Sequence, residues 1–179
     1  MNQVLITEMP LASISAESIR QARQLAQQSR RRLIEVLQDQ SELPQDVFLA
    51  ALGEAFQYPT LDNKSLHELS TDFDVLPFAE AYQRECIPLR TAEGALLIAI
   101  ADPFADGLAN WLLERVRRQF ELHLAHYADV SAFLSRHEET LKAMDKVLAH
   151  EHESGQQAVT LSEGIEQLSL SSISADSSP

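Results

Sequence analysis

The residues that could ligate a metal or act as a nucleophile are few, and their spacing does not favour a site. The single cysteine, Cys86, lies beside Ile87 and just ahead of an apolar run, which predicts a buried structural thiol. His123 and His126 fall on one predicted strand, where they would face opposite sides, so both are interpreted as surface or rim histidines. We expect no metal site and no bound cofactor.

The sequence also lacks the motifs of nucleotide binding and hydrolysis. None of its five glycines begins a G-x-x-x-x-G-K-[ST] phosphate loop or a G-x-G-x-x-G turn, and no G-x-S-x-G elbow presents a serine nucleophile. The acidic pairs Asp72 with Asp74 and Glu138 with Glu139 are expected in a loop and on an exposed helix face. These observations predict a binding module and not an enzyme.

The net charge of the chain indicates which classes of binding partner to expect. A formal net charge of -13 disfavours nucleic acid and anionic lipid, because binding to phosphate needs clustered Lys and Arg. A protein partner is the better expectation. The run Arg30, Arg31 and Arg32 is the local exception, and it is interpreted as a solvated helix face paired with Glu35 and Asp39, with an anion or partner contact as the alternative.

No stretch reaches the length of apolar sequence that a membrane span needs, and the first residues lack the features of a signal peptide. We therefore expect a cytoplasmic protein without direct membrane insertion.

The first elements of secondary structure that the sequence predicts are two helices in a hairpin. Apolar residues at helical spacing predict a first helix from Ser15 to about Gln40, with Ser29 as the place for a break. A second helix is expected from Pro44 and ends at Tyr58. The polar stretch that follows is expected to be a connecting loop that lets the hairpin move.

A small sheet is predicted after this loop, which makes the fold class α/β (α+β). Three strands are expected, and the last, with alternating apolar and polar residues, is interpreted as an edge strand. Helices around Trp111 and Phe133 are expected to pack on the sheet. The expected strands are Ile87 to Arg90, Ala95 to Ala101 and Phe120 to Ala125.

Composition divides the chain into five predicted parts. They are a flexible N-terminus (1–14), a helical subdomain (15–60), a connecting loop (61–75), a small α/β subdomain (76–150) and a flexible linker (151–179).

Four segments carry a resemblance to a known family. The run IPLRTAEGALLIAIADPF (Ile87 to Phe104), the helix LPFAEAYQRE (Leu76 to Glu85) and the exit LGEAFQYPTLD (Leu52 to Asp62) resemble the N-terminal domain of type II secretion and type IV pilus assembly ATPases. The tail LSLSSISADSSP (Leu168 to Pro179) resembles the connector that precedes the catalytic part of these enzymes. The likeness covers roughly Arg30 to the C-terminus.

The resemblance implies a non-catalytic docking domain. Its partner would be the cytoplasmic domain of an inner-membrane platform protein, so the module would lie at the inner membrane through that partner. The parent protein would be a hexameric ATP-binding motor whose Walker A loop lies outside this sequence. A stand-alone regulator that imitates the ATPase domain is a further hypothesis.

Some members of this family bind cyclic di-GMP through tandem R-L-G-x-x-L-V-x-x-G motifs. The resemblance therefore implies cyclic di-GMP sensing as the alternative to docking. The matching stretch begins with Arg32 and Leu33, but Ile34 and Ser41 stand where the glycines are expected. Side chains at these positions would hinder close approach of a ligand to the backbone. Arg32 and Leu33 are thus the candidate binding residues for this alternative only.

Overall fold

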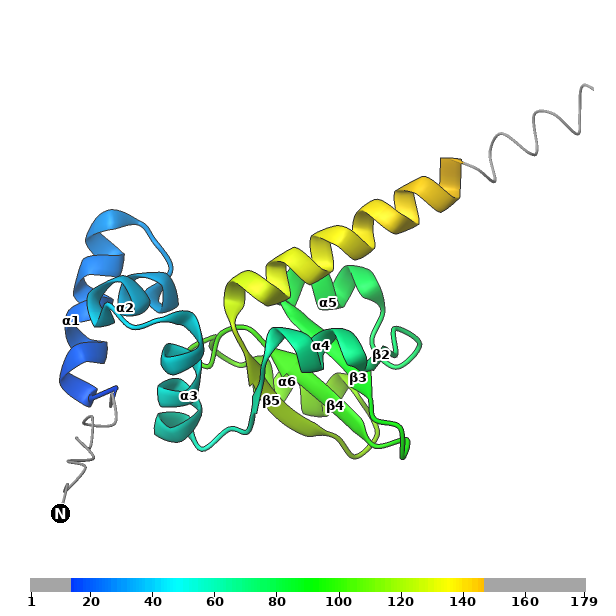
Figure 1. Ribbon diagram of the computed structural model, residues 1–179, viewed down its shortest axis with the longest axis horizontal. Helices are drawn as coiled ribbons and strands as arrows, with labels where there is room; N and C mark the ends of the chain where they lie inside the picture. Colours follow the sequence, from blue (N-terminus) through cyan, green and yellow to red (C-terminus); the bar gives the residue numbers. More distant parts are fainter. Residues whose placement is uncertain (1–13, 147–179) are drawn as a thin grey trace, which may run out of the picture. The chain divides into compact units, whose positions relative to one another are not determined.

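The computed structural model describes residues 14–146 of the 179-residue chain. These residues fall into a first unit that ends at Leu134 and a second that begins at Ser135, whose described part, residues 135–146, is helical. The first unit holds three N-terminal helices and a mixed sheet with helices on both faces (Figure 1). No helix in the described part of the chain is long and apolar enough to cross a bilayer.

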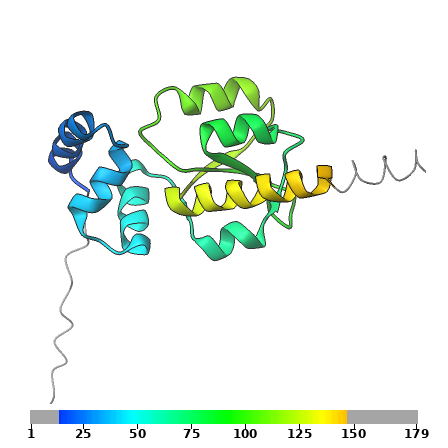
Figure 2. The same cartoon turned by 90° about the horizontal axis from the view of Figure 1, so that it is seen from above.

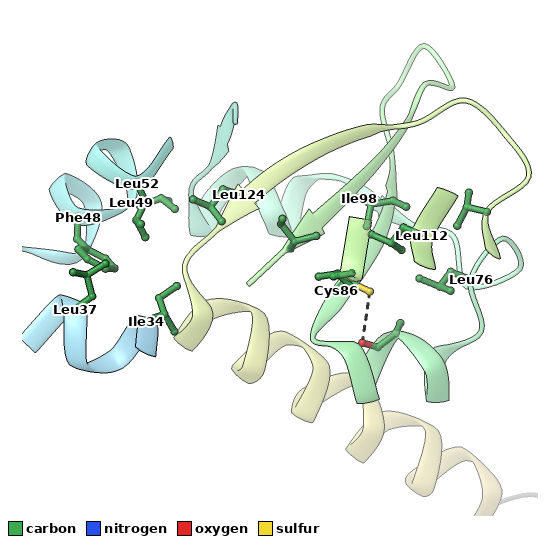
Figure 3. Close-up of a cluster of buried hydrophobic side chains, with 14 of the residues drawn as sticks. Ile34, Leu37, Phe48, Leu49, Leu52, Leu76, Cys86, Ile98, Leu112 and Leu124 are labelled. Atoms are coloured by element: carbon green, nitrogen blue, oxygen red, sulfur yellow. Dashed lines mark hydrogen bonds between the residues drawn. The ribbon is translucent and has the colours of Figure 1, made fainter. Parts of the chain in front are cut away.

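Three helices open the first unit and share a core with one face of the sheet. They are α1 (Ala16–Ser29), α2 (Leu33–Ser41) and α3 (Gln45–Phe56). α1 buries only two small side chains, Ala22 and Ala26, so its own contribution to the core is modest. The larger buried side chains come from α2 and α3, and Figure 3 shows four of them close together: Leu37, Phe48, Leu49 and Leu52.

The first predicted helix is two helices. Ser15 caps α1 as expected, since its hydroxyl accepts a hydrogen bond from the Ser18 amide. Arg30 then adopts the left-handed conformation, with φ of 54°, and its N–H bonds to the carbonyl of Ala26. This residue ends α1 next to Ser29, the predicted break point, and the chain turns before α2 begins.

Five strands form one mixed sheet in the order β1-β5-β4-β3-β2. β1, β5 and β4 are parallel to their neighbours, whereas β3 and β2 join the sheet in antiparallel pairs. The expected α/β class is confirmed. The strands are β1 (Thr60–Leu61), β2 (Ser70–Thr71), β3 (Cys86–Arg90), β4 (Leu96–Ile100) and β5 (Glu121–Ala125).

The sheet differs from the prediction in its edges. The expected three strands are present as β3, β4 and β5, but β1 and β2 flank them. Each of these added strands has only two residues, too few to show a periodic pattern. The prediction that the strand ending at Ala125 lies at the edge is wrong, because β1 pairs alongside it, with Leu61 opposite Ala125.

Helices cover both faces of the sheet. α5 (Phe78–Arg84) and α6 (Leu108–Arg115) pack on one face, and α4 (Asn63–Glu68) packs on the other together with the helical residues 127–134. Figure 2 shows α5 and α6 on the side opposite α4. The first unit is therefore a three-layer arrangement around the sheet.

The central strand β4 contributes buried side chains to both faces of the sheet. β4 is buried along its whole length, as its continuous apolar sequence predicts. Leu96, Ile98 and Ile100 belong to the core shared with α5, α6 and the N-terminal helices, whereas Leu97 and Ala99 belong to the core under α4. This alternation places two separate clusters on one strand.

The contact between α3 and β1 depends on a residue without a side chain. Gly53 is buried in α3, and a Cβ atom there would lie 2.4 Å from Thr60 Cγ2 and 2.9 Å from the Tyr58 carbonyl oxygen. Both distances are far below van der Waals contact. Glycine thus lets the helix approach the first strand closely.

Residues 61–75, the predicted connecting loop, contain the end of β1, helix α4 and strand β2. The division of the chain into subdomains and the mobility of the hairpin stay predictions. Residues 1–13 and 147–179 lie outside the described residues, and so do the predictions made for them, including the resemblance of the tail to an ATPase connector.

Candidate functional site

Arg32, the first candidate residue, lies where the N-terminal helices meet the sheet. It precedes α2 in an extended conformation. Its guanidinium faces the carboxylate of Glu85 with two nitrogens, and Nη1 donates to Oε1 over 2.9 Å. Nη2 also lies 3.8 Å from Asp102 Oδ2. Arg32 thereby joins the start of α2 to the segments that flank β3 and β4.

Asp102 gives this arginine a structural role. The residue follows β4, and its Oδ1 accepts a hydrogen bond of 2.8 Å from the Phe104 amide, which closes the turn after the strand. Burial raises the pKa of the Asp102 carboxyl, whereas the Phe104 amide and the Arg32 charge act in the opposite direction. Arg32 is a counter-charge for a largely buried carboxylate.

His126 is buried, and the prediction of a surface or rim position is wrong for it. Its Nδ1 accepts a hydrogen bond from the Ala128 amide over 3.2 Å, so Nε2 carries the proton and donates to Gln38 Oε1 over 2.9 Å. Phe48 meets the imidazole edge-on, with ring centroids 6.3 Å apart. β5 ends one residue earlier, so the side chain turns under α2 and α3 instead of outward.

His123 lies on β5 itself, and its side chain is 15% exposed. Its Nε2 is 3.6 Å from Glu121 Oε2, and neither ring nitrogen has a hydrogen-bond partner in the described part of the chain. The two histidines therefore have different surroundings and do not form a joint site.

The polar side chains described above gather where the parallel strands β4 and β5 end. Asp102 follows β4 and His126 follows β5, so both lie at the carboxyl ends of parallel strands, where open α/β sheets usually bind ligands. In this chain Arg32 and Gln38, from the start and the middle of α2, occupy the carboxyl ends of these strands. We call Arg32, Gln38, Glu85, Asp102 and His126 the Arg32 cluster. Its polar groups bind one another, so it fastens α2 to the sheet.

The other positions of the cyclic di-GMP motif are also in use. Leu33 is half-buried against the core, and Ile34, at an expected glycine position, is a fully buried core residue. Ser41 ends α2, and its hydroxyl donates to the Gln38 carbonyl over 2.7 Å. A ligand that approached this backbone as the motif requires would meet these side chains.

The arginine run is divided among three roles. Arg30 ends α1, and Arg32 belongs to the Arg32 cluster. Arg31 pairs with Asp39 at 2.7 Å and lies 3.8 Å from Glu35, so the expected ion pairs are confirmed for this residue alone. The run does not form one helix face, because it lies between α1 and α2.

Cys86 is fully buried at the start of β3, as predicted. Its Sγ lies 3.9 Å from the Ala81 carbonyl oxygen, the contact drawn in Figure 3. Burial raises the pKa of the thiol to about 12. A thiol with this pKa is almost wholly protonated at neutral pH and is a poor nucleophile.

Comparison with known proteins assigns the whole sheet and the helices α4, α5 and α6 to a family. Residues 56–144 match the MshEN domain family. The chain contains an MshEN domain. The expected relationship to the N-terminal domains of secretion and pilus assembly ATPases is thereby confirmed. No curated protein matches the chain in sequence.

One solved structure shows the same kind of fold. The structure of MshE with cdg aligns with a TM-score of 0.51 at 23% identity, over 69% of this chain and 89% of that one. Two crystal forms of the N-terminal domain of XpsE align at 18% and 20% identity, with TM-scores of 0.45 and 0.47. They cover 69% of this chain in both cases and 86% and 85% of theirs.

The MshEN domain of this chain carries one feature that sequence reasoning missed. Arg90, Arg115, Arg117 and Arg118 line a hollow of about 820 Å³ beside the C-terminal end of α6. The signal in the sequence is the run Arg-Val-Arg-Arg directly after an amphipathic helix, in a chain that is otherwise strongly acidic.

Proposed function

We propose that this chain is a non-catalytic N-terminal docking module of a type II secretion or type IV pilus assembly ATPase. Its partner is the cytoplasmic domain of an inner-membrane platform protein. The module lies on the cytoplasmic side of the inner membrane through that partner, and the parent protein is a hexameric ATPase.

The MshEN match over residues 56–144 carries the proposal. The internal contacts of the chain support a binding role. In the Arg32 cluster each charged or polar group has a partner within the protein, and Cys86 is buried and protonated. The net charge of -13 favours a protein partner over nucleic acid or anionic lipid.

Calorimetric titration tests the proposal directly. The cytoplasmic domain of the platform protein encoded with this chain is titrated into it, and cyclic di-GMP is titrated in parallel. We expect saturable binding of the protein and no heat from the nucleotide. Absence of protein binding, with the chain folded by circular dichroism, would count against the docking function.

Cyclic di-GMP sensing is the second candidate, and one observation favours it: the fold resembles MshE, whose structure was solved with cdg. The contacts in this chain weigh against it, because Arg32 is engaged by Glu85 and Ile34 fills the core. Binding of the nucleotide that is lost in Arg32→Ala and kept in the control Arg23→Ala would establish this second function.

A further inference from the structure

The surface around α6 combines two neighbouring hollows of different character. The first, of about 820 Å³, is lined by the four arginines at positions 90, 115, 117 and 118. The second, of about 420 Å³, lies along α6 and the start of β5 and is mainly apolar. Arg118 and Phe120 line a smaller depression that connects the two. We call this continuous surface the α6 face.

Two of the arginines on the α6 face are already paired. Arg115 donates to both carboxylate oxygens of Glu80, over 2.6 and 2.7 Å. Arg90 pairs with Asp72 and donates to the Gly94 carbonyl over 3.0 Å. These contacts hold two guanidinium groups at the wall of the hollow.

The other two arginines are exposed. Arg117 and Arg118 follow α6, and neither forms an ion pair with any residue that the structure describes. Arg117 and Arg118 are adjacent in a chain that has 14 basic residues against 27 acidic ones. A negatively charged group here would gain attraction without breaking an existing pair.

The second hollow supplies apolar area beside these charges. Leu113 is 66% exposed on the outer side of α6, whereas its neighbour Leu112 is fully buried. Tyr58, Pro59 and Phe120 line the same hollow. Figure 2 shows α6 as the outermost helix on its side of the sheet. An apolar groove edged by charge is typical of a surface for a protein partner.

We propose that the α6 face binds a segment of the partner protein in which apolar side chains are followed by acidic residues. The apolar side chains enter the hollow at Leu113 and Phe120, and the carboxylates pair with Arg117 and Arg118. This assignment rests on the proposed docking function and adds the surface and the chemistry of the partner.

Charge and polarity favour a peptide over a phosphate-bearing ligand. Asp72, Asp74 and Glu114 line the first hollow together with the four arginines, so its positive charge is largely offset. A ligand with many phosphates, such as nucleic acid or a lipid surface, needs a larger excess of positive charge than two unpaired arginines supply. Nor would such a ligand use the apolar hollow at Leu113.

Two variants test the assignment, with binding of the platform protein's cytoplasmic domain measured by calorimetry. The double substitution Arg117→Glu with Arg118→Glu is expected to weaken binding by about tenfold or more, and to reduce its dependence on salt. Leu113→Gln is expected to weaken binding by about fivefold through lost apolar contact. All three positions are exposed, so circular dichroism and urea unfolding should match the wild type.

Matched controls on α1 separate the α6 face from general charge effects. Arg20→Glu with Arg23→Glu makes the same change in net charge, and Leu25→Gln replaces a leucine that is also exposed, at 42%. Both are expected to bind within about twofold of the wild type. Equal losses in variants and controls would overturn the assignment.

The outcomes distinguish this assignment from the proposed function. If the wild-type chain binds the platform protein and the α6-face variants bind it equally well, the assignment is wrong and the docking function stands. If the wild-type chain does not bind, both fall. Vesicles that contain phosphatidylglycerol are run as a parallel probe, and wild-type binding to them that depends on Arg117 and Arg118 would replace the peptide with a lipid surface.

Discussion

At the scale of single residues, Arg32 is the cation that lies beside both carboxylates of the Arg32 cluster. We expect Arg32→Ala to lower the free energy of unfolding by about 1–2 kcal/mol, because it leaves the Glu85 and Asp102 carboxylates without their cation. Lysine at this position should restore only part of the loss, because it cannot face the carboxylate with two nitrogens. Urea unfolding measures both.

The control for Arg32 is Arg20, whose pair with Glu17 is fully on the surface of α1. Arg20→Ala should change the free energy of unfolding by less than about 0.5 kcal/mol. Equal effects at both positions would show that the Arg32 cluster contributes no more than a surface ion pair.

His126 should make stability depend on pH. Burial lowers the pKa of its imidazole below the ordinary value of 6.5, although Asp129 acts in the opposite direction. The unfolded chain therefore binds the proton more readily than the folded one. Stability from this group is present above about pH 6.5 and is lost as the pH falls below that value.

His126→Gln is expected to flatten this part of the profile while it lowers stability at neutral pH, since the contact with Gln38 changes. Urea unfolding between pH 7 and 5 provides the measurement, with His67→Gln on the exposed face of α4 as the control. A wild-type profile that stays parallel to that of His126→Gln would contradict the expectation.

The reactivity of the Cys86 thiol should report how often β3 becomes exposed to solvent. With its pKa raised to about 12 and its side chain fully buried, the thiol should react with a thiol reagent only when β3 is exposed. We expect less than about one percent of the reaction rate of the unfolded chain in water, and full reactivity in urea. Rapid modification of the native chain would show that β3 opens without global unfolding.

At the scale of elements, the approach of α3 to β1 should resist any side chain at position 53. Alanine is favoured over glycine inside a helix by about 1 kcal/mol, yet Gly53→Ala should destabilise the chain by about 1–3 kcal/mol. The reason is the 2.4 Å that would separate the new Cβ from Thr60 Cγ2. Thermal unfolding compares it with Ala55→Gly, an exposed position of α3 that should cost only the intrinsic preference.

The sequence predicted the elements whose pattern is local. The run from Ala95 to Ala101 gave β4 within a residue at each end because a strand buried on both faces is apolar throughout. β1 and β2 were missed because two residues carry no period, and their pairing is set by contacts distant in the chain. His126 was misplaced for a similar reason: its burial depends on Gln38 and Phe48, which come from helices far earlier.

The same limit applies to the candidate sites. Arg32 could be singled out from its motif, but its partner Glu85 lies 53 positions later and no spacing rule connects them. The α6 face was missed because Leu113 and the arginines after it resemble the ordinary outer side of an amphipathic helix. Only the hollows between α6, β5 and the loop at Tyr58 give those residues a common surface.

At the scale of the whole first unit, the N-terminal helices and the sheet should unfold together. One core cluster contains Phe48 of α3 and Leu112 of α6, and the Arg32 cluster adds polar contacts between the same parts. We expect coincident urea transitions from far-ultraviolet circular dichroism, which reports all helices, and from fluorescence of Trp111, the only tryptophan. Separate transitions would instead favour the predicted mobile hairpin.

The short strands at the two margins of the sheet have a consequence for solubility. β1 and β2 have two residues each, so the sheet ends on both sides in a very short strand. Long open edges are the usual template on which a neighbouring molecule adds a strand and begins to aggregate. A chain with such short edge strands can be concentrated in solution with little tendency to polymerise through its backbone.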